Sequence, residues 1–296
     1  MSEPLGLYYT PAMSSQADVA PGLYLVATPI GNLEDITLRA IRVLKQCNLI
    51  ACEDTRQTQK LLNHYGIEKP TISYHEHNEG ARAAELVERL AQGTRIAVVS
   101  DAGMPGISDP GFRLVSLAIE RGIPVVPVPG PAAFVSALVG SGLPVDSFTF
   151  RGFLPAKAGA RLRQLEAIRD SPQTEIFYEA PHRLRETIAE VVELLGPTRR
   201  IVIARELTKV HEEFLRGAAG KVLKILQERR EVKGEITLLI APAAPESVTA
   251  PTQSIGERVQ QIMTQERVDE KSALKKVAKE RGISKSEAYR MMQKWN

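Results

Sequence analysis

The stretch RIAVVSDAGMPGISDPG, Arg95–Gly111, does most to decide the fold of this chain. It opens with a run rich in aliphatic residues that predicts a strand. The loop that follows holds three glycines, two prolines and two aspartates. Glycine permits positive φ and close backbone approach, while proline stiffens the path. Ligands of α/β sheets bind beyond the carboxyl ends of strands, so this loop is either a binding site or a structural crossover turn.

Similar runs lie on both sides of this stretch. LYLVAT, LIAC, TISY and PVVPV alternate with segments of helical period, such as Ile36–Gln46 and Glu79–Ala91. This alternation predicts an α/β layer with a largely parallel sheet, which closes at the turn-rich seam GSGLP. Two more loops follow its strands, at Thr28–Gly31 and Pro129–Ala133.

A second α/β unit begins at Phe148, with strands FTFRGF, TEIFYEA, RIVIARE, EEFLRG and EITLLIAP. Helical segments are predicted between these strands, at Ala158–Asp170, His182–Leu195 and Ala218–Arg230. The following stretch APAAPESVTAPTQS has no apolar period and is typical of a linker. We therefore predict an N-terminal extension, two α/β domains, a linker and a basic helical domain, at residues 1–21, 22–144, 145–242, 243–254 and 255–296.

The overall composition narrows the class of protein to which this chain can belong. The 296 residues are 43% hydrophobic and carry a net charge of +3, as expected for a globular protein of about two domains. Two cysteines are too few for a disulfide scaffold. No run approaches the roughly 18 apolar residues of a membrane span, and no secretory signal is visible. We expect a soluble, cytoplasmic protein.

The loop chemistry argues against a nucleotide-phosphate site. Neither a P-loop nor a Gly-x-Gly-x-x-Gly motif is present, and Asp101 and Asp109 would repel a phosphate. Carboxylates suit hydroxyls, amines or a cation, and S-adenosylmethionine (SAM) offers all three. The acidic-glycine loop of Rossmann-like methyltransferases is absent, so a methyltransferase would need another fold.

Nine motifs in order carry a specific resemblance. They are VATPIGNLEDITLRA, CEDTRQT, YHEHNE, SDAGMPGISDPG, PVPGPAA, FRGFLP, FYEAPHRL, ARELTKVHEE and KGEITLLI. Over about Gly22–Pro242 the chain resembles the ribosomal RNA small subunit methyltransferase I family, a branch of the tetrapyrrole methylase superfamily. The usual Gly-x-Gly-Pro-Gly first loop of the superfamily is Ala27–Gly31 here, a departure that marks the rRNA branch and speaks against a tetrapyrrole substrate.

The resemblance implies a two-domain α/β methylase, typically a homodimer, that binds SAM between its domains. It also implies methylation of the ribose 2′-oxygen of a cytidine in the decoding region of 16S rRNA, within the small ribosomal subunit. Carried onto this chain, the expected cofactor contacts are Thr28, Pro29, Gly31, Ser100, Asp101, Ala102, Gly103, Pro105, Gly106, Gly130, Pro131, Ala132, Tyr178, Ala204, Gly234, Glu235 and Thr237. We expect Gly130→Val to abolish SAM binding and leave the fold intact, and Thr237→Ala to weaken binding if its hydroxyl faces the cleft.

Polar residues of the recognised motifs are the candidates for aligning the ribose hydroxyl and removing its proton. The catalytic candidates are His75, Glu179, His182, Arg183, Glu206 and Lys209. Each has a structural alternative: a solvated loop at His75, a helix-capping turn at Glu179–Arg183 and a surface ion-pair network at Glu206–Lys209. The identity of the base stays open, with Lys233 and Glu235 equally possible.

Residues near these motifs are candidates for RNA contact. We assign this role to Arg56, His77 and Asn78. His75 and His77 lack a third ligand of convincing spacing, so no metal site is predicted. Asp54 or Thr55 is expected to cap the helix that runs to Tyr65.

The tail from Ile255 is helix-forming and basic, with ten basic and six acidic residues. A helix over Ala273–Arg281, a break at Gly282–Ile283 and a capping box at Ser284–Glu287 outline a helix-turn-helix. The residues predicted to meet RNA phosphates are Lys275, Lys276, Lys279, Lys285 and Arg290. The alternative is a small bundle that docks on its own core or on a dimer mate.

Two rival functions remain open on sequence grounds. The same fold could methylate a tetrapyrrole or a modified protein histidine. A non-catalytic RNA-binding assembly factor could instead retain only the scaffold.

Overall fold

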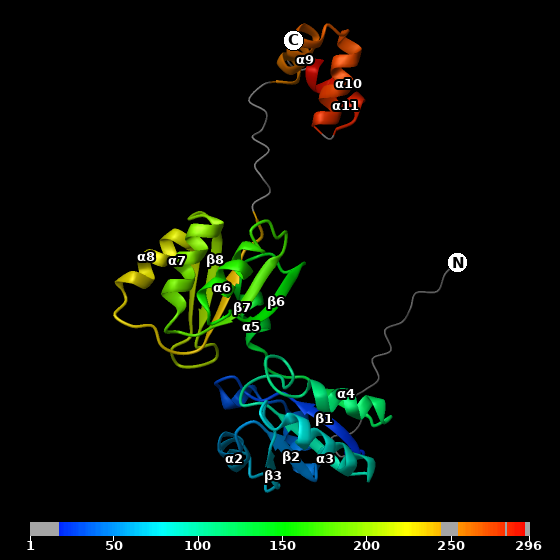
Figure 1. Ribbon diagram of the computed structural model, residues 1–296, viewed down its shortest axis with the longest axis vertical. Helices are drawn as coiled ribbons and strands as arrows, with labels where there is room; N and C mark the ends of the chain where they lie inside the picture. Colours follow the sequence, from blue (N-terminus) through cyan, green and yellow to red (C-terminus); the bar gives the residue numbers. More distant parts are fainter. Residues whose placement is uncertain (1–17, 244–253, 282, 294–296) are drawn as a thin grey trace, which may run out of the picture. The chain divides into compact units, whose positions relative to one another are not determined.

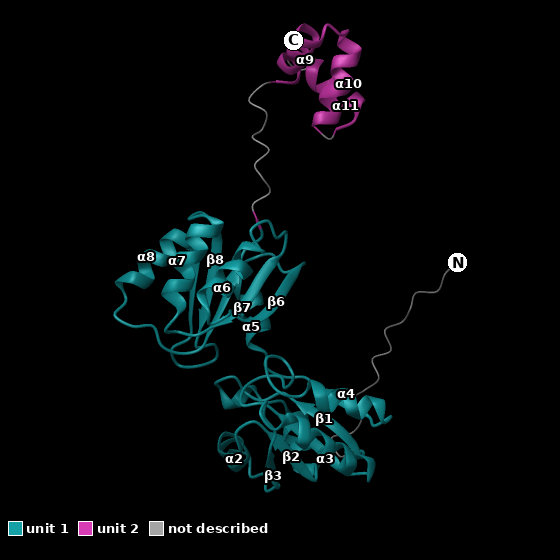
Figure 2. Ribbon diagram, in the orientation of Figure 1, with its two compact units in different colours: residues 1–242 teal, residues 243–296 magenta. Residues whose placement is uncertain are grey.

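The computed structural model describes residues 18–243, 254–281 and 283–293. It divides into two compact units, residues 1–242 and 243–296 (Figure 2). Within the described residues, none of the helices combines the length and the apolar character that a bilayer crossing requires.

The first sheet is parallel throughout, as the sequence predicts, with strand order β3-β2-β4-β1-β5 (Figure 1). Its strands are β1 Gly22–Val26, β2 Leu49–Cys52, β3 Thr71–Ser73, β4 Arg95–Val99 and β5 Val125–Val128. A 3₁₀ turn, Leu33–Asp35, and four helices connect them: α1 Leu38–Gln46, α2 Thr55–His64, α3 Glu79–Ala91 and α4 Phe112–Glu120. Aliphatic side chains from both faces of the sheet form two separate cores, as expected where helices cover both sides of a parallel sheet.

The second sheet has the order β6-β7-β10-β8-β9, in which only β6 and β7 are parallel. Its strands are β6 Phe148–Phe153, β7 Thr174–Glu179, β8 Arg200–Arg205, β9 Glu213–Ala218 and β10 Ile236–Ile240. The helices are α5 Ala133–Ser141, α6 Ala158–Glu166, α7 Leu184–Leu195 and α8 Ala219–Glu228. The predicted second α/β unit is therefore present, with mostly antiparallel pairing. Strands β8 and β9 are joined without a helix, as antiparallel neighbours can be, and β10, which follows α8, lies antiparallel between β7 and β8.

Helix α5 precedes the boundary predicted at residue 144, yet it packs on the second sheet (Figure 1). Its Ala137 and Leu138 are buried with Ile176 of β7 and Leu239 of β10. We therefore call residues 22–128 the first lobe and residues 133–240 the second lobe of the 1–242 unit. The turn Pro129–Ala132 joins them.

Local capping follows the sequence in the first lobe. Asp54 is the N-cap of α2, and its carboxylate accepts the backbone N–H of Arg56 at 2.8 Å, which confirms the cap predicted for this helix. Thr37 caps α1 in the same way, with its hydroxyl 3.1 Å from the N–H of Ala40.

The 243–296 unit holds three helices among its described residues: α9 Ile255–Glu266, α10 Glu270–Glu280 and α11 Lys285–Gln293. They share a small core that includes Val259, Leu274, Val277 and Ala288. The predicted helices at α10 and α11 are confirmed, while α9 was not predicted as an element of its own. Ser284 accepts the N–H of Glu287 at 3.2 Å; the predicted glycine of the break, Gly282, lies outside the described residues.

Candidate methyl-donor pocket

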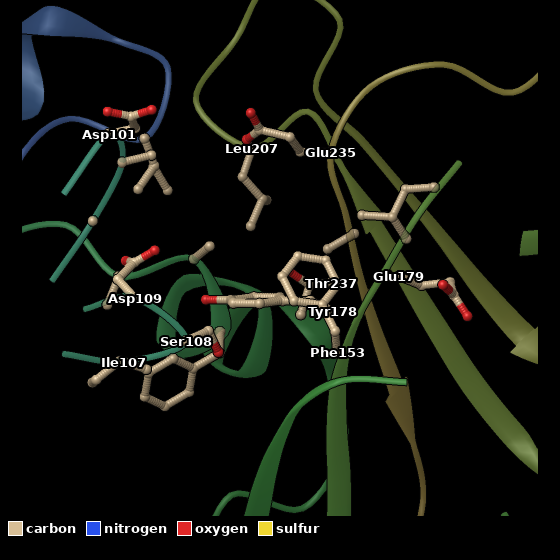
Figure 3. Close-up of a pocket in the computed structure, with 18 of the residues that line it drawn as sticks. Asp101, Ile107, Ser108, Asp109, Phe153, Tyr178, Glu179, Leu207, Glu235 and Thr237 are labelled. Atoms are coloured by element: carbon tan, nitrogen blue, oxygen red, sulfur yellow. The ribbon is translucent and has the colours of Figure 1, made fainter. Parts of the chain in front are cut away.

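A pocket of about 390 Å³ opens between the two lobes (Figure 3). The first lobe lines it with Ile30, Asp101, Ala102, Gly103, Met104, Ile107, Ser108 and Asp109. The joining turn and the second lobe line it with Ala132, Ala133, Phe134, Phe153, Tyr178, Glu179, Ala180, Pro181, Ala204, Leu207, Gly234, Glu235, Ile236 and Thr237. Its size is that of a site for one drug-sized ligand.

The first-lobe wall is the loop that follows β4. Thr28 fixes this loop, because it exchanges two backbone hydrogen bonds with Gly103 at 2.9 and 3.0 Å. Its buried hydroxyl donates to the carbonyl of Ser100 at 3.0 Å. Gly103 has φ +83°, where L side chains are strained. The glycine and these bonds turn the loop so that Asp101 and Asp109 line the pocket.

Carboxylates give this wall a negative character. Burial raises the pKa of Asp109 to about 6, with the charges of Glu53 and Asp101 adding to it and a hydrogen bond from Ser100 opposing it. Burial also raises the pKa of Asp101, whose carboxylate accepts the backbone N–H of Asp54 at 3.2 Å. Crowded acids of this kind favour a bound cation or hydrogen-bond donor.

The second-lobe wall is the face of the mixed sheet. Thr237 of β10 lies in register with Tyr178 of β7 on one side and Ala204 of β8 on the other. Because paired residues share a face, all three line the pocket, and the small Ala204 and Thr237 leave space beside the Tyr178 ring. Phe150 and Phe153 contact that ring edge-on, with centroids 5.0 and 5.4 Å away.

Glu179 borders the pocket, but its carboxylate belongs to the second lobe. It accepts Nη2 of Arg183 at 2.6 Å, the hydroxyl of Thr187 at 2.6 Å and the N–H of Ala180 at 2.7 Å. Figure 3 shows the side chain pointing away from the other labelled residues. Glu179 and Arg183 are therefore bound to each other within the second lobe, and Arg183, the N-cap of α7, makes no side-chain cap hydrogen bond. The neighbouring His182 is exposed and outside the pocket lining.

Glu206, Lys209 and Glu235 form an ion-pair network at the lip of the pocket. Glu206 accepts Nζ of Lys209 at 2.8 Å and the N–H of Glu235 at 2.9 Å, and these bonds lower its pKa. A Cβ on Gly31 would overlap the Lys209 side chain, so the two lobes touch closely here. Asn32 adds a backbone bond to the hydroxyl of Thr208 at 3.1 Å.

Several expected cofactor residues are not among those that line the pocket. They are Thr28, Pro29, Gly31, Ser100, Pro105, Gly106, Gly130 and Pro131. A Cβ on Gly130 would lie 2.8 Å from the Cβ of Ala27. The side chain of Gly130→Val would therefore collide with Ala27, the residue after β1, so we expect this substitution to disturb the protein itself as well as any bound ligand.

Hydrogen bonds within the loop fix the conformation of the segment that carries His75 and His77. Asn78 accepts the N–H of His75 at 2.9 Å and donates to Ser73 at 3.2 Å, which assigns it to the turn before α3. The rings of His75 and His77 lie 6.0 Å apart. Arg56 is exposed and paired with Asp54. In the part of the chain that the structure describes, no three His, Cys, Asp or Glu side chains gather as metal ligands would.

The basic residues singled out in the tail are all exposed on its helices. Lys276 pairs with Glu266 across α10 and α9. Lys275, Lys279, Lys285 and Arg290 also point to the outside of this small bundle, since its interior is apolar.

Sequence reasoning did not assign a role to several lining residues: Ile30, Met104, Ile107, Ser108, Phe134, Phe153 and Leu207. Ile107 and Ser108 belong to the loop that was singled out, next to Asp109, so their position was open to prediction. Phe134 and Phe153 reach the pocket from a helix start and a strand end, where an aromatic residue alone carries no signal.

The comparisons with known proteins agree with this architecture. Residues 22–223 match the family of tetrapyrrole (corrin/porphyrin) methylases. The fold is similar to uroporphyrin-III-C-methyltransferase from Thermus thermophilus, with a TM-score of 0.52, 20% identity and coverage of 75% of this chain and 95% of that one. Diphthine synthase superposes with a TM-score of 0.58 at 12% identity, over 74% and 89% of the two chains. The fold and its interlobe pocket thus define a SAM-dependent methylase of the tetrapyrrole methylase class.

Closer relatives narrow the class. Ribosomal RNA small subunit methyltransferase I of Halalkalibacterium halodurans is 47% identical over 278 residues, which cover 93% of this chain and 95% of the relative. The protein of the same name from Mesorhizobium japonicum is 51% identical over 223 residues, or 75% and 76% of the two chains. The chain belongs to the ribosomal RNA small subunit methyltransferase I family.

The pocket fits SAM by chemistry as well as by size. Asp101 and Asp109 suit the amine, the sulfonium or the ribose hydroxyls, while Ala204 and Leu207 offer an apolar surface for the adenosine part. No basic side chain lines the pocket among the described residues, which a phosphate-bearing cofactor would need.

Proposed function

We propose that this protein methylates the ribose 2′-oxygen of a cytidine in the decoding region of 16S rRNA. The observation that carries the proposal is the acidic, strand-backed pocket between the lobes of a chain that belongs to this family. The names of its relatives support the small-subunit rRNA, and the resemblance supports the cytidine and the 2′-oxygen. We propose a cytoplasmic activity on this basis, because an rRNA substrate is found there.

We assign cofactor binding to the lining residues that the resemblance also indicates: Asp101, Ala102, Gly103, Ala132, Tyr178, Ala204, Gly234, Glu235 and Thr237. Bound SAM supplies a methyl group on a sulfonium that an oxygen nucleophile can attack. The lobes orient the ribose hydroxyl in line with that methyl, and this alignment is the main source of acceleration.

Asp109 is our candidate for the proton acceptor. Its carboxyl lines the pocket and ionises at about pH 6, close to the operating pH at which a general base is most effective. His75, His182, Glu206, Lys209 and the Glu179–Arg183 pair, by contrast, have structural partners or lie outside the lining.

A basic groove beside the pocket supports an RNA substrate. Arg205, Arg229, Arg230 and Lys233 line it with Glu231 and Val232, and Lys233 directly precedes Gly234 of the pocket. Glu213 pairs with both Arg205 and Arg229, and Glu231 pairs with Lys233. Four basic side chains against these two acidic ones leave a net positive charge at the groove. Phosphate contacts of this kind give RNA affinity that falls steeply with salt.

The helical unit and a second copy of the chain complete the proposal. Exposed lysines of α10 and α11 would add phosphate contacts to those of the groove. Exposed Phe112 and Ile119 on α4 would be covered in a homodimer. Light scattering tests the dimer, and a variant ending at Ala243 tests the tail: its RNA affinity and salt slope should both fall.

The decisive experiment maps ribose methylation in the small-subunit rRNA of cells that lack the protein. We expect one cytidine to lose its 2′-O-methyl group and to regain it when purified protein and SAM are added to subunits or to free rRNA. Loss of a base methyl group, or no loss in rRNA, would instead point to another acceptor.

A further inference from the structure

A bulge near the end of β6 changes which residue faces the pocket. Phe148, Thr149 and Phe150 pair in order with Thr174, Glu175 and Ile176, but Phe153 then pairs with Tyr178. Three steps along β6 thus match two along β7, and Gly152 takes φ +67° to allow it. Regular pairing would place Gly152 opposite Tyr178. The bulge places an aromatic ring there instead, as bulges beside functional sites often do.

Hydrogen bonds fix the backbone of Leu154, the residue after the bulge, through both its N–H and its carbonyl group. Leu154 donates its N–H to the carbonyl of Tyr178 at 3.2 Å, and its own carbonyl accepts Nη2 of Arg183 at 3.3 Å. Its side chain is 1% exposed in the second-lobe core. Phe153 therefore stands on a fixed strand end, and its ring rests against Tyr178 with centroids 5.4 Å apart.

The Phe153 ring nevertheless remains open to solvent. It is 60% exposed, whereas Tyr178 behind it is mostly covered and Thr237 is 3% exposed. Across the mouth lies the first-lobe loop, where Ile107 is 37% exposed. Ser108 approaches the bulge, since a Cβ on Gly152 would lie 3.3 Å from its hydroxyl oxygen. Packing within the chain does not explain an anchored aromatic side chain that faces outward at a pocket entrance.

We propose that Phe153 is the platform on which the base of the target nucleotide stacks when it is turned out of the RNA strand. This inference rests on the proposed function. The interior of the pocket is sized for the cofactor, so the acceptor ribose has to approach from the mouth, where Phe153 lies. Proteins that act on or read unpaired RNA bases hold them on aromatic side chains, and the rigid support of Phe153 keeps the cost of ordering it low.

The test compares Phe153→Ala and Phe153→Trp with the wild type on small-subunit rRNA. Loss of one stacked base lowers affinity by about 5- to 150-fold, so kcat/KM for RNA should fall by that factor in Phe153→Ala. Phe153→Trp should retain most of the wild-type value, and the SAM Kd should stay within about 2-fold for both. Phe148→Ala is the matched control, because Phe148 lies on the same strand, is 43% exposed and is outside the pocket lining.

Three results would overturn the inference. One is an unchanged kcat/KM for RNA in Phe153→Ala. Another is a parallel loss of SAM affinity, which would place the adenine of the cofactor on Phe153. In the third, Phe148→Ala would lose as much activity as Phe153→Ala. A wild-type protein that does not methylate small-subunit rRNA would overturn the proposed function itself, which separates that failure from the others.

Discussion

The two walls of the pocket are built in different ways. The first-lobe wall is a loop, turned at glycines and fixed by the bonds between Thr28 and Gly103. The second-lobe wall is a sheet face, on which the register of β7, β10 and β8 brings Tyr178, Thr237 and Ala204 together. The loop supplies charge through its aspartates, while the sheet supplies shape.

This difference predicts how each wall responds to substitution. A sheet face is held by many backbone bonds, so a changed side chain alters the cavity volume and little else. A loop carboxylate contributes through charge, and its effect should depend on pH. Substitutions in the two walls should therefore differ in how strongly they lower SAM affinity.

The largest effect is expected from filling the cavity on the sheet side. In Ala204→Phe the added ring would occupy space that the ligand needs, and the expected loss of SAM affinity is about 100-fold or more. Isothermal titration calorimetry measures it. Ala189→Phe, on the exposed side of α7, should bind normally, and normal binding by Ala204→Phe as well would place the cofactor elsewhere.

A smaller effect is expected from the loop side. Asp101→Asn keeps the shape of the side chain and removes its charge, and a charge-assisted hydrogen bond contributes about 1.5–3 kcal/mol. Because Asp101 is exposed, we expect the lower end of this range, a rise of about 10-fold in the SAM Kd. Asp146→Asn, an exposed change outside the pocket, is the control. Equal affinity in Asp101→Asn and the control would remove the loop from charge recognition.

The two walls also differ in how well the sequence alone predicts which residues line them. The loop was identified directly, because glycine, proline and aspartate cluster at the end of a strand, and the alternating pattern predicted the parallel sheet that carries it. The sheet face depends on register between strands distant in sequence. The pairing of β6 with β7 contains the bulge at Gly152, which turns Phe153 toward the pocket. The alternation of side chains along β7 turns Glu179 away from it.

Asp109 gives the pH dependence of the loop wall. Its carboxyl is neutral below about pH 6 because burial raises its pKa, so Asp109→Asn should match the wild type in SAM affinity at pH 5. Above pH 7 the variant should bind about 3-fold more weakly, as expected for a partly exposed charge. Titrations at the two pH values measure the ratio, and a constant ratio would mean that the charge of Asp109 does not act on the ligand.

The charge of Asp109 should have the opposite effect on folding stability, which it lowers as the pH rises. The folded pKa of Asp109 lies above the ordinary value of 3.8, so its contribution to stability is present at low pH and lost as pH rises through about 6. Asp109→Asn should therefore gain stability relative to the wild type between pH 5 and pH 7. Thermal unfolding at both values checks the sign.

The smallest effect on SAM affinity is expected at Glu179, although it directly follows Tyr178 on β7. Adjacent strand residues face opposite sides of a sheet, and the Glu179 carboxylate meets three donors inside the second lobe. Glu179→Gln leaves Arg183 without its anion and should lower the free energy of unfolding by about 1–3 kcal/mol. Urea denaturation measures this loss, with the exposed Glu193→Gln of α7 as control.

Measurements of SAM affinity and of stability together show whether the Glu179 carboxylate supports the fold or binds the ligand. A SAM Kd within about 2-fold of wild type, combined with the lower unfolding free energy, assigns this carboxylate to the start of α7. A large loss of SAM affinity at unchanged stability would place it in the binding wall with Tyr178. The description of the second wall as one face of a sheet would then be wrong, because β7 would contribute side chains from both of its faces to the same pocket.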